Sequence, residues 1–396
     1  MSQRATPDGL RDGIIRRGST YSYVVRVPDP SSGKTRPRWV GGFATASEAK
    51  AARDLARVSA RRGSYVDRSS LTVGEYLDEW LAGHVEVKPK THLEYGKIIR
   101  LYLNPRIGPV RLQGLRPAEI SRLYKDLLEG GGRGGAPLSP RSVEYTHAVL
   151  HRALSDAARE HQLITSNPAA VAKRPWKAVR RDSGATRTPD MTVFESQSLR
   201  RFLDAAAEHR LHAFFRLAAY TGARRGELLN LRWNDIDFTT GDVTLSGSVA
   251  VVGGQRIEGT TKSDRGRLVR VDAGTIAALR DHRRRQVEER LVAGSLWRDD
   301  ADLVFRRQDG AALFPDTVSQ LMPRFCQASG VPRLRLHDLR HTHATTLLLA
   351  GVAPHVVADR LGHRDATVTL RIYAHVLRRH AAAVGDVFAR AVESDC

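Results

Sequence analysis

The sequence predicts a multidomain α+β protein with three parts: a small N-terminal domain of β-sheet plus helix, an all-α domain, and a mainly α C-terminal domain with a small antiparallel sheet. Three observations support this class. Strand-like alternation occurs near the N-terminus and around 236–271. Helix caps followed by apolar residues at helical spacing fill 71–172. The length of 396 residues allows two or three domains, each with its own core.

Residues 1–66 are predicted to form the N-terminal domain. Residues 21–27 alternate as a strand does, and 36–43 form a second candidate strand after a turn that contains Pro and Gly. Thr45 and Glu48 form a capping box that opens a helix ending at Gly63. Basic residues outnumber acidic ones here, so the sheet could lie in a DNA groove. A regulatory or dimerising module with a solvated basic face is the alternative.

Residues 71–172 are predicted to be all helical. Thr72 with Glu75 and Thr91 with Glu94 form two further capping boxes, each followed by apolar residues at helical spacing. Later helices should begin near Pro117 and Pro140. The aromatic residues of this domain are interpreted as core. The expected DNA contacts are basic side chains such as Lys88, Lys90, Lys97 and Arg100.

Residues 173–189 are predicted to be a basic linker. The segment contains Pro and Gly, has six basic residues against one Asp, and lacks hydrophobic periodicity. Such a linker can follow a phosphate backbone or act as a plain spacer. Residues 190–388 then form the C-terminal domain, in which Gly-containing turns near Gly241 and Gly253 separate short antiparallel strands.

The charge balance favours a polyanionic partner. The chain has 63 Lys and Arg against 43 Asp and Glu, a formal net charge of +20 and a pI near 10.6. Because the charge is spread over the whole chain, nucleic acid is the leading candidate. An arginine-rich codon bias would explain the ratio of Arg to Lys, but not a net charge of this size.

Little in the sequence suggests a metal centre, a secretory signal or a membrane span. Cys326 and Cys396 lie far apart and have no metal-ligand spacing, which fits a reduced compartment. The first residues are polar, and the apolar run 345–353 is too short to cross a bilayer. We therefore expect a soluble, intracellular protein that makes no membrane contact.

The C-terminal domain concentrates residues suited to phosphoryl transfer. Arg224 follows the helix end at Thr221-Gly222, which places it at the start of the next helix, and Glu227 could support it from the same face. His337 and Arg340 share a helix face. Guanidinium groups can hold the charge of a phosphate transition state where metal ions otherwise would. A zinc pair of His337 with a neighbouring histidine is a much weaker alternative, because no further ligand pattern accompanies it. The neighbouring Arg225 has a weaker claim to the site, because it is equally consistent with a solvated surface position.

Lysine and tyrosine are almost absent from this domain, which makes two residues conspicuous. After Thr221 the only lysine is Lys262 and the only tyrosine is Tyr373, among many arginines. A lysine can give up a proton at neutral pH, whereas an arginine cannot. A tyrosine beside cations and a proton acceptor such as His363 can act as a nucleophile. A surface lysine and a core tyrosine are the plain alternatives.

Together these segments resemble the tyrosine recombinase (phage integrase) family. The resemblance rests on Thr-Gly-Ala-Arg-Arg-Gly-Glu-Leu from Thr221, His-Asp-Leu-Arg-His from His337, and Leu-Gly-His from Leu361 through to Tyr373, with Lys262 between them. It implies that 71–172 is a core-binding domain and 190–388 the catalytic domain. The N-terminal sheet plus helix resembles the arm-type DNA-binding domain of element-encoded integrases.

The resemblance also implies roles for six catalytic residues. Tyr373 would attack the scissile phosphate to form a 3′-phosphotyrosyl bond, and Lys262 would protonate the leaving 5′ oxygen. Arg224 and Arg340 would bind the non-bridging oxygens, with His337 and His363 completing the site. No metal or cofactor is expected.

The implied partners are double-stranded DNA, with core-type and arm-type attachment sites, and three further copies of the chain in a tetramer. An excisionase or a host DNA-bending protein is a further possibility. The expected outcome is integration and excision of a phage or other mobile element. The alternatives are a catalytically silent DNA-binding regulator on the same scaffold and a type IB topoisomerase that relaxes DNA.

Overall fold

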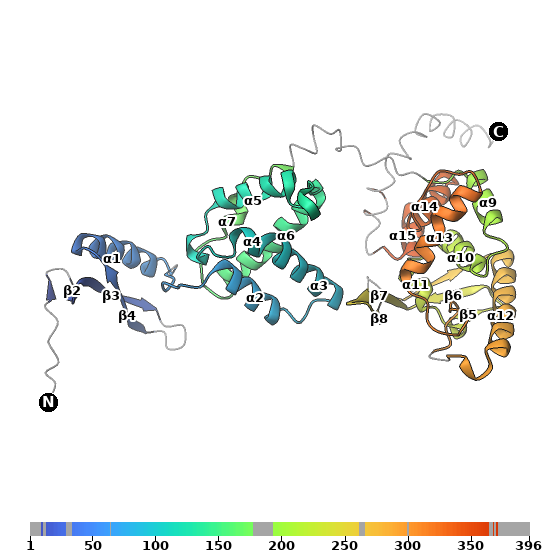
Figure 1. The fold of residues 1–396 in the computed structure, drawn as a ribbon, viewed down its shortest axis with the longest axis horizontal. Coiled ribbons are helices and arrows are strands. Elements are labelled where there is room, and N and C mark those ends of the chain that lie inside the picture. The colour runs from blue at the N-terminus through green and yellow to red at the C-terminus, as the bar shows by residue number, and fades with distance from the viewer. Residues whose placement is uncertain are drawn as a thin grey trace, which may run out of the picture. The chain divides into compact units, whose positions relative to one another are not determined.

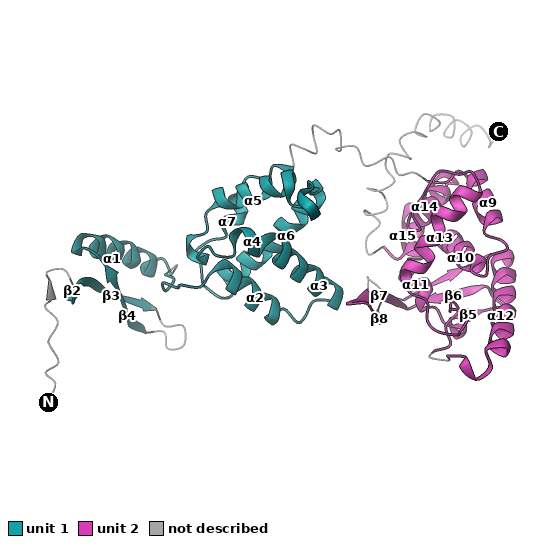
Figure 2. Cartoon of the chain, viewed as in Figure 1, with its two compact units in different colours: residues 1–186 teal, residues 187–396 magenta. Residues whose placement is uncertain are grey.

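The computed structural model describes residues 9–10, 13–28, 34–63, 65–176, 193–260, 266–298, 301–363, 367 and 370. The chain divides into two compact units, residues 1–186 and 187–396 (Figure 2). The boundary falls within the segment predicted as a linker. Unit 1 contains a small sheet with one helix and a helical bundle, and unit 2 contains helices with small sheets (Figure 1). The predicted multidomain α+β class is confirmed.

The N-terminal sheet is antiparallel, with its strands in sequence order. The strands are β1 (Gly9–Leu10), β2 (Ile14–Arg17), β3 (Thr20–Pro28) and β4 (Thr35–Phe43), and helix α1 (Ala46–Arg61) follows them. Alternate residues of β3, namely Tyr23, Val25 and Val27, are buried with alanines of α1. Thr45 caps α1 by accepting a hydrogen bond from the amide of Glu48, as its capping box predicts. Both predicted strands are confirmed, and β1 and β2 extend the sheet beyond them.

The second part of unit 1 is all helical, as predicted. Its helices are α2 (Val73–Gly83), α3 (Pro89–Ile98), the π-helix η1 (Ile99–Leu103), α4 (Asn104–Ile107), η2 (Leu112–Gly114), α5 (Pro117–Gly130), η3 (Arg133–Gly135), α6 (Pro140–Arg159) and α7 (Pro168–Val171). The capping box of Thr72 and Glu75 is complete and opens α2. The box predicted at Thr91 and Glu94 is wrong, because α3 already begins at Pro89, whose fixed φ suits the first helical position.

Most aromatic residues of the helical domain lie in its core, as expected, whereas Tyr145 is 42 % exposed. Tyr76 is buried and donates its hydroxyl to the carbonyl of Ala153 at 2.7 Å. Trp176 is 1 % exposed and packs edge-on against buried Tyr124, with ring centroids 5.0 Å apart. Trp176 lies inside the predicted linker segment, so the packed helical body reaches at least this residue.

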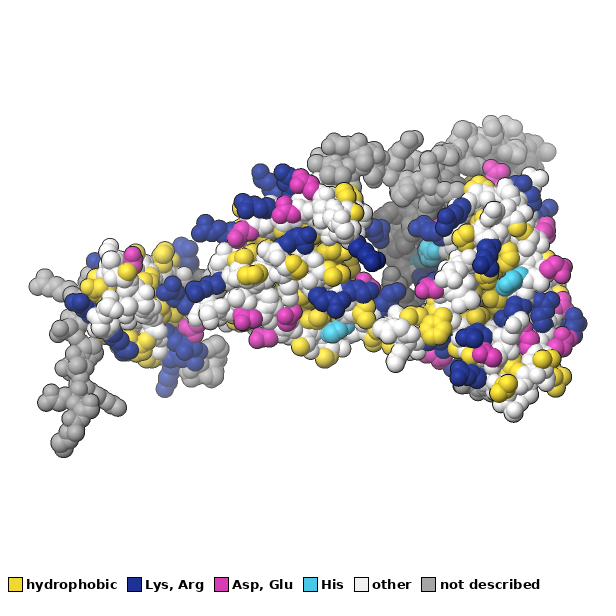
Figure 3. All heavy atoms as spheres, viewed as in Figure 1, with side chains coloured by type: hydrophobic (Ala, Val, Ile, Leu, Met, Phe, Trp, Pro, Cys, Tyr) yellow, Lys and Arg dark blue, Asp and Glu magenta, His cyan; other side chains and the backbone are white. Residues whose placement is uncertain are grey.

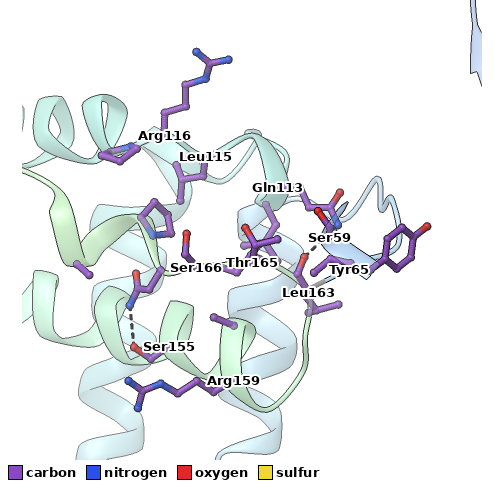
Figure 4. Close-up of a pocket in the computed structure, with 18 of the residues that line it drawn as sticks. Ser59, Tyr65, Gln113, Leu115, Arg116, Ser155, Arg159, Leu163, Thr165 and Ser166 are labelled. Carbon is purple, nitrogen blue, oxygen red and sulfur yellow. Dashed lines mark hydrogen bonds between the residues drawn. The ribbon is translucent and has the colours of Figure 1, made fainter. Parts of the chain in front are cut away.

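Unit 1 also contains a cavity of about 860 Å³, lined in part by helix ends and loops of the helical domain (Figure 4). At its wall, Gln113 Nε2 donates to the carbonyls of Asp67 and Leu163 at 2.7 and 3.1 Å. Asn167 donates to Ser155 Oγ at 2.8 Å. The bond from Gln113 to Asp67 ties the segment that precedes α2 to the bundle. None of the four candidate catalytic residues that the structure describes, Arg224, His337, Arg340 and His363, lines this cavity.

Unit 2 combines helices with two small antiparallel sheets (Figure 1). Its helices are α9 (Ser196–Ala205), α10 (His212–Thr221), α11 (Arg225–Asn230), η4 (Trp233–Asp235), α12 (Ala273–Ala293), η5 (Gly294–Leu296), α13 (Pro315–Ala328), α14 (Asp338–Leu349) and α15 (Pro354–Leu361). Its strands are β5 (Ile236–Asp237), β6 (Asp242–Leu245), β7 (Gly247–Val252), β8 (Gln255–Thr260) and β9 (Arg267–Arg270). One sheet has the order β5-β6-β9, and β7 pairs with β8 as a hairpin. The strand-rich patch predicted within 236–271 is confirmed.

A phenylalanine cluster holds α10 in the centre of unit 2. Phe214 and Phe215 of α10 are fully buried, and they pack edge-to-face on Phe305 and Phe325, with centroids 5.1 Å apart in both pairs. Burying side chains of this size stabilises a core by about 2–3 kcal/mol each. The end of α10, where the first arginine segment begins, is therefore fixed by the core.

The surface is rich in charge on both units, and Figure 3 shows many Lys and Arg side chains on the visible face. Even the 21-residue helix α12 carries a dense series of arginines and glutamates. Within the described ranges, no helix has both the length and the apolar character that a membrane crossing requires.

Candidate active site

The first arginine segment lies at the tight turn from α10 to α11. Gly222 ends α10 in the left-handed conformation, with φ of 63°. A Cβ at this position would lie 2.6 Å from Leu361 Cδ2 and 2.9 Å from His343 Cδ2, so both the backbone and the space require glycine. The turn places Arg224 at the N-cap of α11, as predicted. Because α11 has only six residues, the guanidinium and not a long helix would carry the positive charge.

Arg224 is held in place by a carboxylate and a carbonyl. Its Nη1 donates to Glu227 Oε1 at 2.8 Å, and its Nη2 donates to the carbonyl of Gly362 at 3.3 Å. The backbone amide of Arg224 also donates to Glu227 Oε2 at 2.9 Å. The side chain of Arg224 remains 24 % exposed. Glu227 therefore supports Arg224, as the i, i+3 spacing predicts, and leaves part of the guanidinium accessible.

Arg340 connects the second arginine segment to the first arginine segment and to the Leu-Gly-His segment that begins at Leu361. It is 3 % exposed and lies on α14. Its Nη1 donates to the carbonyl of Gly222 and its Nη2 to the carbonyl of Leu361, each at 2.7 Å. Arg340 and Arg224 therefore bind the carbonyls of the consecutive residues Leu361 and Gly362.

Glu227 is a buried carboxylate between two arginines. Its Oε2 accepts a hydrogen bond from Arg267 Nη2 at 2.7 Å, while Oε1 accepts one from Arg224. Burial alone would raise the pKa of Glu227, but the hydrogen bonds and charges of Arg267 and Arg224 outweigh it and lower this pKa below its ordinary value. Glu227 therefore stays ionised and acts as a structural anion.

His363 follows Gly362, which ends α15 in the left-handed conformation with φ of 68°. Its backbone amide donates to the carbonyl of Ala358 at 2.9 Å. Burial, with the nearby charges of Arg340 and Arg224, lowers the pKa of His363 to about 4. The imidazole is therefore neutral at pH 7 when no anion is bound.

His337 is the N-cap of α14, and its ring meets the His341 ring edge-on with centroids 5.0 Å apart. Burial, with the charges of His341 and Arg340, lowers the pKa of His337 to about 4. Two neutral imidazoles, one each in the second arginine segment and after α15, thus accompany two fixed guanidinium groups. Such a set can bind one phosphate and exchange a proton with it.

The remaining sequence predictions have different outcomes. Lys262 lies in 261–265, between β8 and β9, and Tyr373 lies beyond residue 370, so both are outside the described residues. Arg225 donates from Nη1 to Ser319 Oγ at 2.6 Å and to the carbonyl of Pro315 at 3.0 Å on α13. It is therefore committed to contacts outside the site, in keeping with its weaker claim.

Two arginines, Arg267 and Arg360, make contacts near the site that were not predicted. Arg267 joins Glu227 to the carbonyl of Arg360, and Arg360 Nε donates to His343 Nε2 at 3.0 Å. Burial, with the charge of Arg360, lowers the pKa of His343 to about 4, so this ring can accept the bond. No local sequence pattern distinguishes Arg267 or Arg360 from the many surface arginines.

Comparison with known families assigns all three regions. Residues 190–380 match the phage integrase family, 72–128 match the phage integrase N-terminal SAM-like domain, and 14–55 match an arm DNA-binding domain.

Curated relatives extend over nearly the whole chain. A "tyrosine recombinase XerC-like" protein of Caldanaerobacter subterraneus subsp. tengcongensis is 28 % identical over 384 residues, covering 93 % of this chain and 95 % of that protein. The ICEBs1 integrase of Bacillus subtilis is 25 % identical and covers 83 % of this chain and 84 % of its own length.

Solved structures share the fold. The Tn1549 transposon integrase in complex with a circular intermediate DNA has a TM-score of 0.63 at 18 % identity, covering 76 % of this chain and 95 % of that one. A lambda integrase tetramer bound to a Holliday junction has a TM-score of 0.53 at 19 % identity, covering 94 % and 96 %. The three domain matches, together with the positions of Arg224 and Arg340, show that the chain belongs to the phage integrase family of tyrosine recombinases.

Proposed function

We propose that this protein is a site-specific DNA recombinase that cleaves and rejoins DNA through a 3′-phosphotyrosyl intermediate. The observation that carries the proposal is the convergence of Arg224 and Arg340 on the consecutive carbonyls of Gly362 and Leu361, immediately before His363. Two fixed guanidinium groups at one turn suit the non-bridging oxygens of a single phosphate.

In the proposed reaction, the Tyr373 oxygen attacks the scissile phosphorus. A bond forms between phosphorus and the phenol oxygen, and the bond from phosphorus to the 5′ oxygen breaks. The phenol proton passes to a neutral acceptor, for which His363 and His337 are the candidates because burial and nearby positive groups keep both rings neutral in the DNA-free protein. Lys262 gives a proton to the departing 5′ oxygen. Attack by another strand's 5′ hydroxyl reverses these steps and restores the phosphodiester.

The two regions of unit 1 supply DNA binding in this proposal. The helical domain would bind the core-type site beside the point of cleavage, in line with its match to the SAM-like domain. The N-terminal domain would bind a separate arm-type site, in line with its match to an arm DNA-binding domain. An arm domain and the integrases among the relatives favour integration and excision of a mobile element.

One face of the N-terminal sheet fits the arm-type site best. Helix α1 covers the face that holds Tyr23 and Val25. The β3 residues between them, with their partners on the neighbouring strands, therefore form the opposite face. On that face Trp39 is 52 % exposed, and the Arg17 guanidinium lies 4.7 Å from its ring centroid. Arg26 is exposed on the same face, two residues beyond Val24, the partner of Trp39. Basic and aromatic groups on an open sheet face suit a DNA groove.

The proposed assembly is a homotetramer on two DNA sites, which exchanges strands pairwise through a Holliday junction. The lambda integrase tetramer on a Holliday junction has the same fold, which supports this assembly. Because the substrate is DNA, the proposed place of action is the cytoplasm at the bacterial nucleoid. An excisionase or a host DNA-bending protein as a further partner stays a prediction.

A nicked suicide duplex with the terminal repeats of its element tests the function. The nick lets the short fragment with the 5′ hydroxyl, on the order of one to a few nucleotides, diffuse away, so that cleavage traps a covalent adduct that cannot religate. Wild-type protein should form the adduct in buffer with EDTA, and Tyr373→Phe should form none. An undiminished adduct from Tyr373→Phe would refute the proposed nucleophile, and loss of the wild-type adduct on chelation would refute the arginine-based site. If plasmids without the repeats are relaxed as fast as plasmids with them, a topoisomerase would be favoured instead.

A further inference from the structure

Arg267 makes contacts that link three parts of the active site, although the sequence gives it no role. It is the first residue of β9, and its side chain is 9 % exposed. Its Nη2 donates to Glu227 Oε2 at 2.7 Å, and its Nε donates to the carbonyl of Arg360 at 2.8 Å. One side chain therefore connects the support of Arg224 with the end of α15, directly before Leu361.

The bond to Glu227 controls how that carboxylate interacts with Arg224. Glu227 has no exposed side-chain area, and its two oxygens pair with different guanidinium groups: Oε1 with that of Arg224, and Oε2 with that of Arg267. Oε2 also accepts a hydrogen bond from the backbone amide of Arg224. If Arg267 lost its bond, Oε2 would have no guanidinium partner and could take a second bond from the Arg224 guanidinium. Glu227 would then neutralise Arg224 more fully and compete with a phosphate for its donors.

The third donor of Arg267 faces the turn that carries His363. Arg267 Nη1 is buried and has no hydrogen-bond partner in the part of the chain that the structure describes. A Cβ at Gly362 would lie 2.9 Å from this atom, so the nitrogen packs directly on the turn. The charge of Arg267 is also among the causes that lower the pKa of His363. A buried cation without a full set of partners is costly to keep, which is expected where the residue serves a function.

We infer that Arg267 is a positioning residue of the cleavage reaction, which keeps Arg224 available to the scissile phosphate through Glu227 and fixes the turn of His363 through Arg360. Its buried guanidinium does not touch the substrate. The inference rests on the proposed function, because it concerns the same phosphate site.

Arg267→Gln and Arg267→Lys test the inference, with Arg210→Gln as the matched control. Arg210 forms a mostly buried pair with Glu289, at 2.8 and 2.6 Å, in the same unit but with none of the site residues. Adduct formation on the suicide duplex is followed in a single turnover at saturating protein, together with thermal unfolding and binding to the uncleaved site. Arg267→Gln should slow adduct formation by roughly 10- to 100-fold with binding nearly unchanged, because misplacement of a reacting group costs rate. Arg267→Lys, which keeps the charge, should recover part of the rate.

A neutral scissile group separates positioning from loss of folding. With a methylphosphonate at the cleaved position, less negative charge needs to be held, so variants that act through Arg224 should lose less rate than on the phosphodiester. On the methylphosphonate substrate, the loss of cleavage rate caused by Arg267→Gln should therefore be smaller, as should the loss caused by Arg224→Lys. In the double variant, the rate should fall by much less than the product of the two single-variant effects. Any deficit of Arg210→Gln should be the same on both substrates.

The outcomes distinguish the inference from the function it rests on. No adduct from the wild-type protein would overturn both. An adduct from wild type with Arg267→Gln equally fast, or with a deficit that matches Arg210→Gln on both substrates, would overturn the role of Arg267 and leave the proposed function standing.

Discussion

Arg340 Nη2 donates to the carbonyl of Leu361 at 2.7 Å, and its Nη1 donates to the carbonyl of Gly222 at the same distance. Arg340 is therefore both a candidate phosphate ligand and the link between the end of α10 and the end of α15. Arg224 occupies a different position: it keeps 24 % of its side chain exposed and is supported mainly by Glu227. The two arginines should respond differently to substitution.

Arg340→Ala should reduce both cleavage and stability. Removal of a transition-state donor should slow adduct formation by about 10²–10³-fold or more. Loss of two buried hydrogen bonds from a charged donor should also lower the free energy of unfolding by about 2–4 kcal/mol. Single-turnover cleavage and urea unfolding measure the two effects.

Arg224→Ala is the comparison. It should slow cleavage as much as Arg340→Ala does, with a smaller loss in the free energy of unfolding, because Glu227 keeps its bond to Arg267. A slowing below about tenfold for either variant would remove that arginine from the phosphate site.

Gly222→Ala should disrupt the junction of the two arginine segments. Its φ of 63° is unfavourable for alanine, and the added Cβ would lie 2.6 Å from Leu361 Cδ2. Strain and crowding together should lower the free energy of unfolding by about 2–4 kcal/mol. Gly253→Ala is a matched control, since Gly253 has a φ of 59° and a Cβ there would have nothing within 4 Å. The control should lose only about 1 kcal/mol in urea unfolding. Equal losses would show that the contact with Leu361 does not matter.

Local features of the fold could be predicted because they depend on neighbouring residues. Thr72 and Glu75 are three residues apart, and their capping box forms as the sequence indicates. The similar pair Thr91 and Glu94 does not form one, because a proline two residues before Thr91 already starts the helix. Where two local signals compete, the one that fixes φ prevails.

The internal support of the site could not be predicted in the same way. Arg267 and Glu227 lie far apart in the sequence, on a strand and a short helix whose packing decides whether they meet. The charge pattern is uninformative, since arginines are common throughout unit 2. By contrast, Glu227 could be proposed as the support of Arg224, because i, i+3 residues share a helix face.

The stability of the DNA-free protein should fall as the pH drops from 7 to 5. Burial and neighbouring positive groups lower the pKa of His337, His343 and His363 from 6.5 to about 4. Between these values the unfolded chain binds protons that the folded chain does not, so the free energy of unfolding decreases with falling pH. The carboxylates contribute little in this window, because they titrate mainly below it. Urea unfolding at several pH values measures the slope.

His343→Gln is the informative variant for this slope. This variant has no titrating ring at position 343 in either the folded or the unfolded state. Its free energy of unfolding should therefore depend less on pH between 7 and 5. Titration of the three rings by NMR should give midpoints well below 6.5. Midpoints of 6–7, the ordinary histidine range, together with a flat stability profile, would contradict the neutral imidazoles on which the proposed proton transfer depends.

Arg26→Ala should weaken binding to the arm-type site and leave cleavage of a core-only suicide duplex unchanged. Arg26 is exposed on the sheet face opposite α1, the face that also carries Trp39. If it contacts one phosphate, the slope of log K against log salt should decrease in magnitude by about 0.9. Arg57→Ala, an exposed arginine on α1, provides the control and should leave this slope as it is. Titrations of an arm-site duplex at several salt concentrations measure both variants. If Arg57→Ala changes the slope and Arg26→Ala does not, the helix and not the open sheet face lies against the DNA.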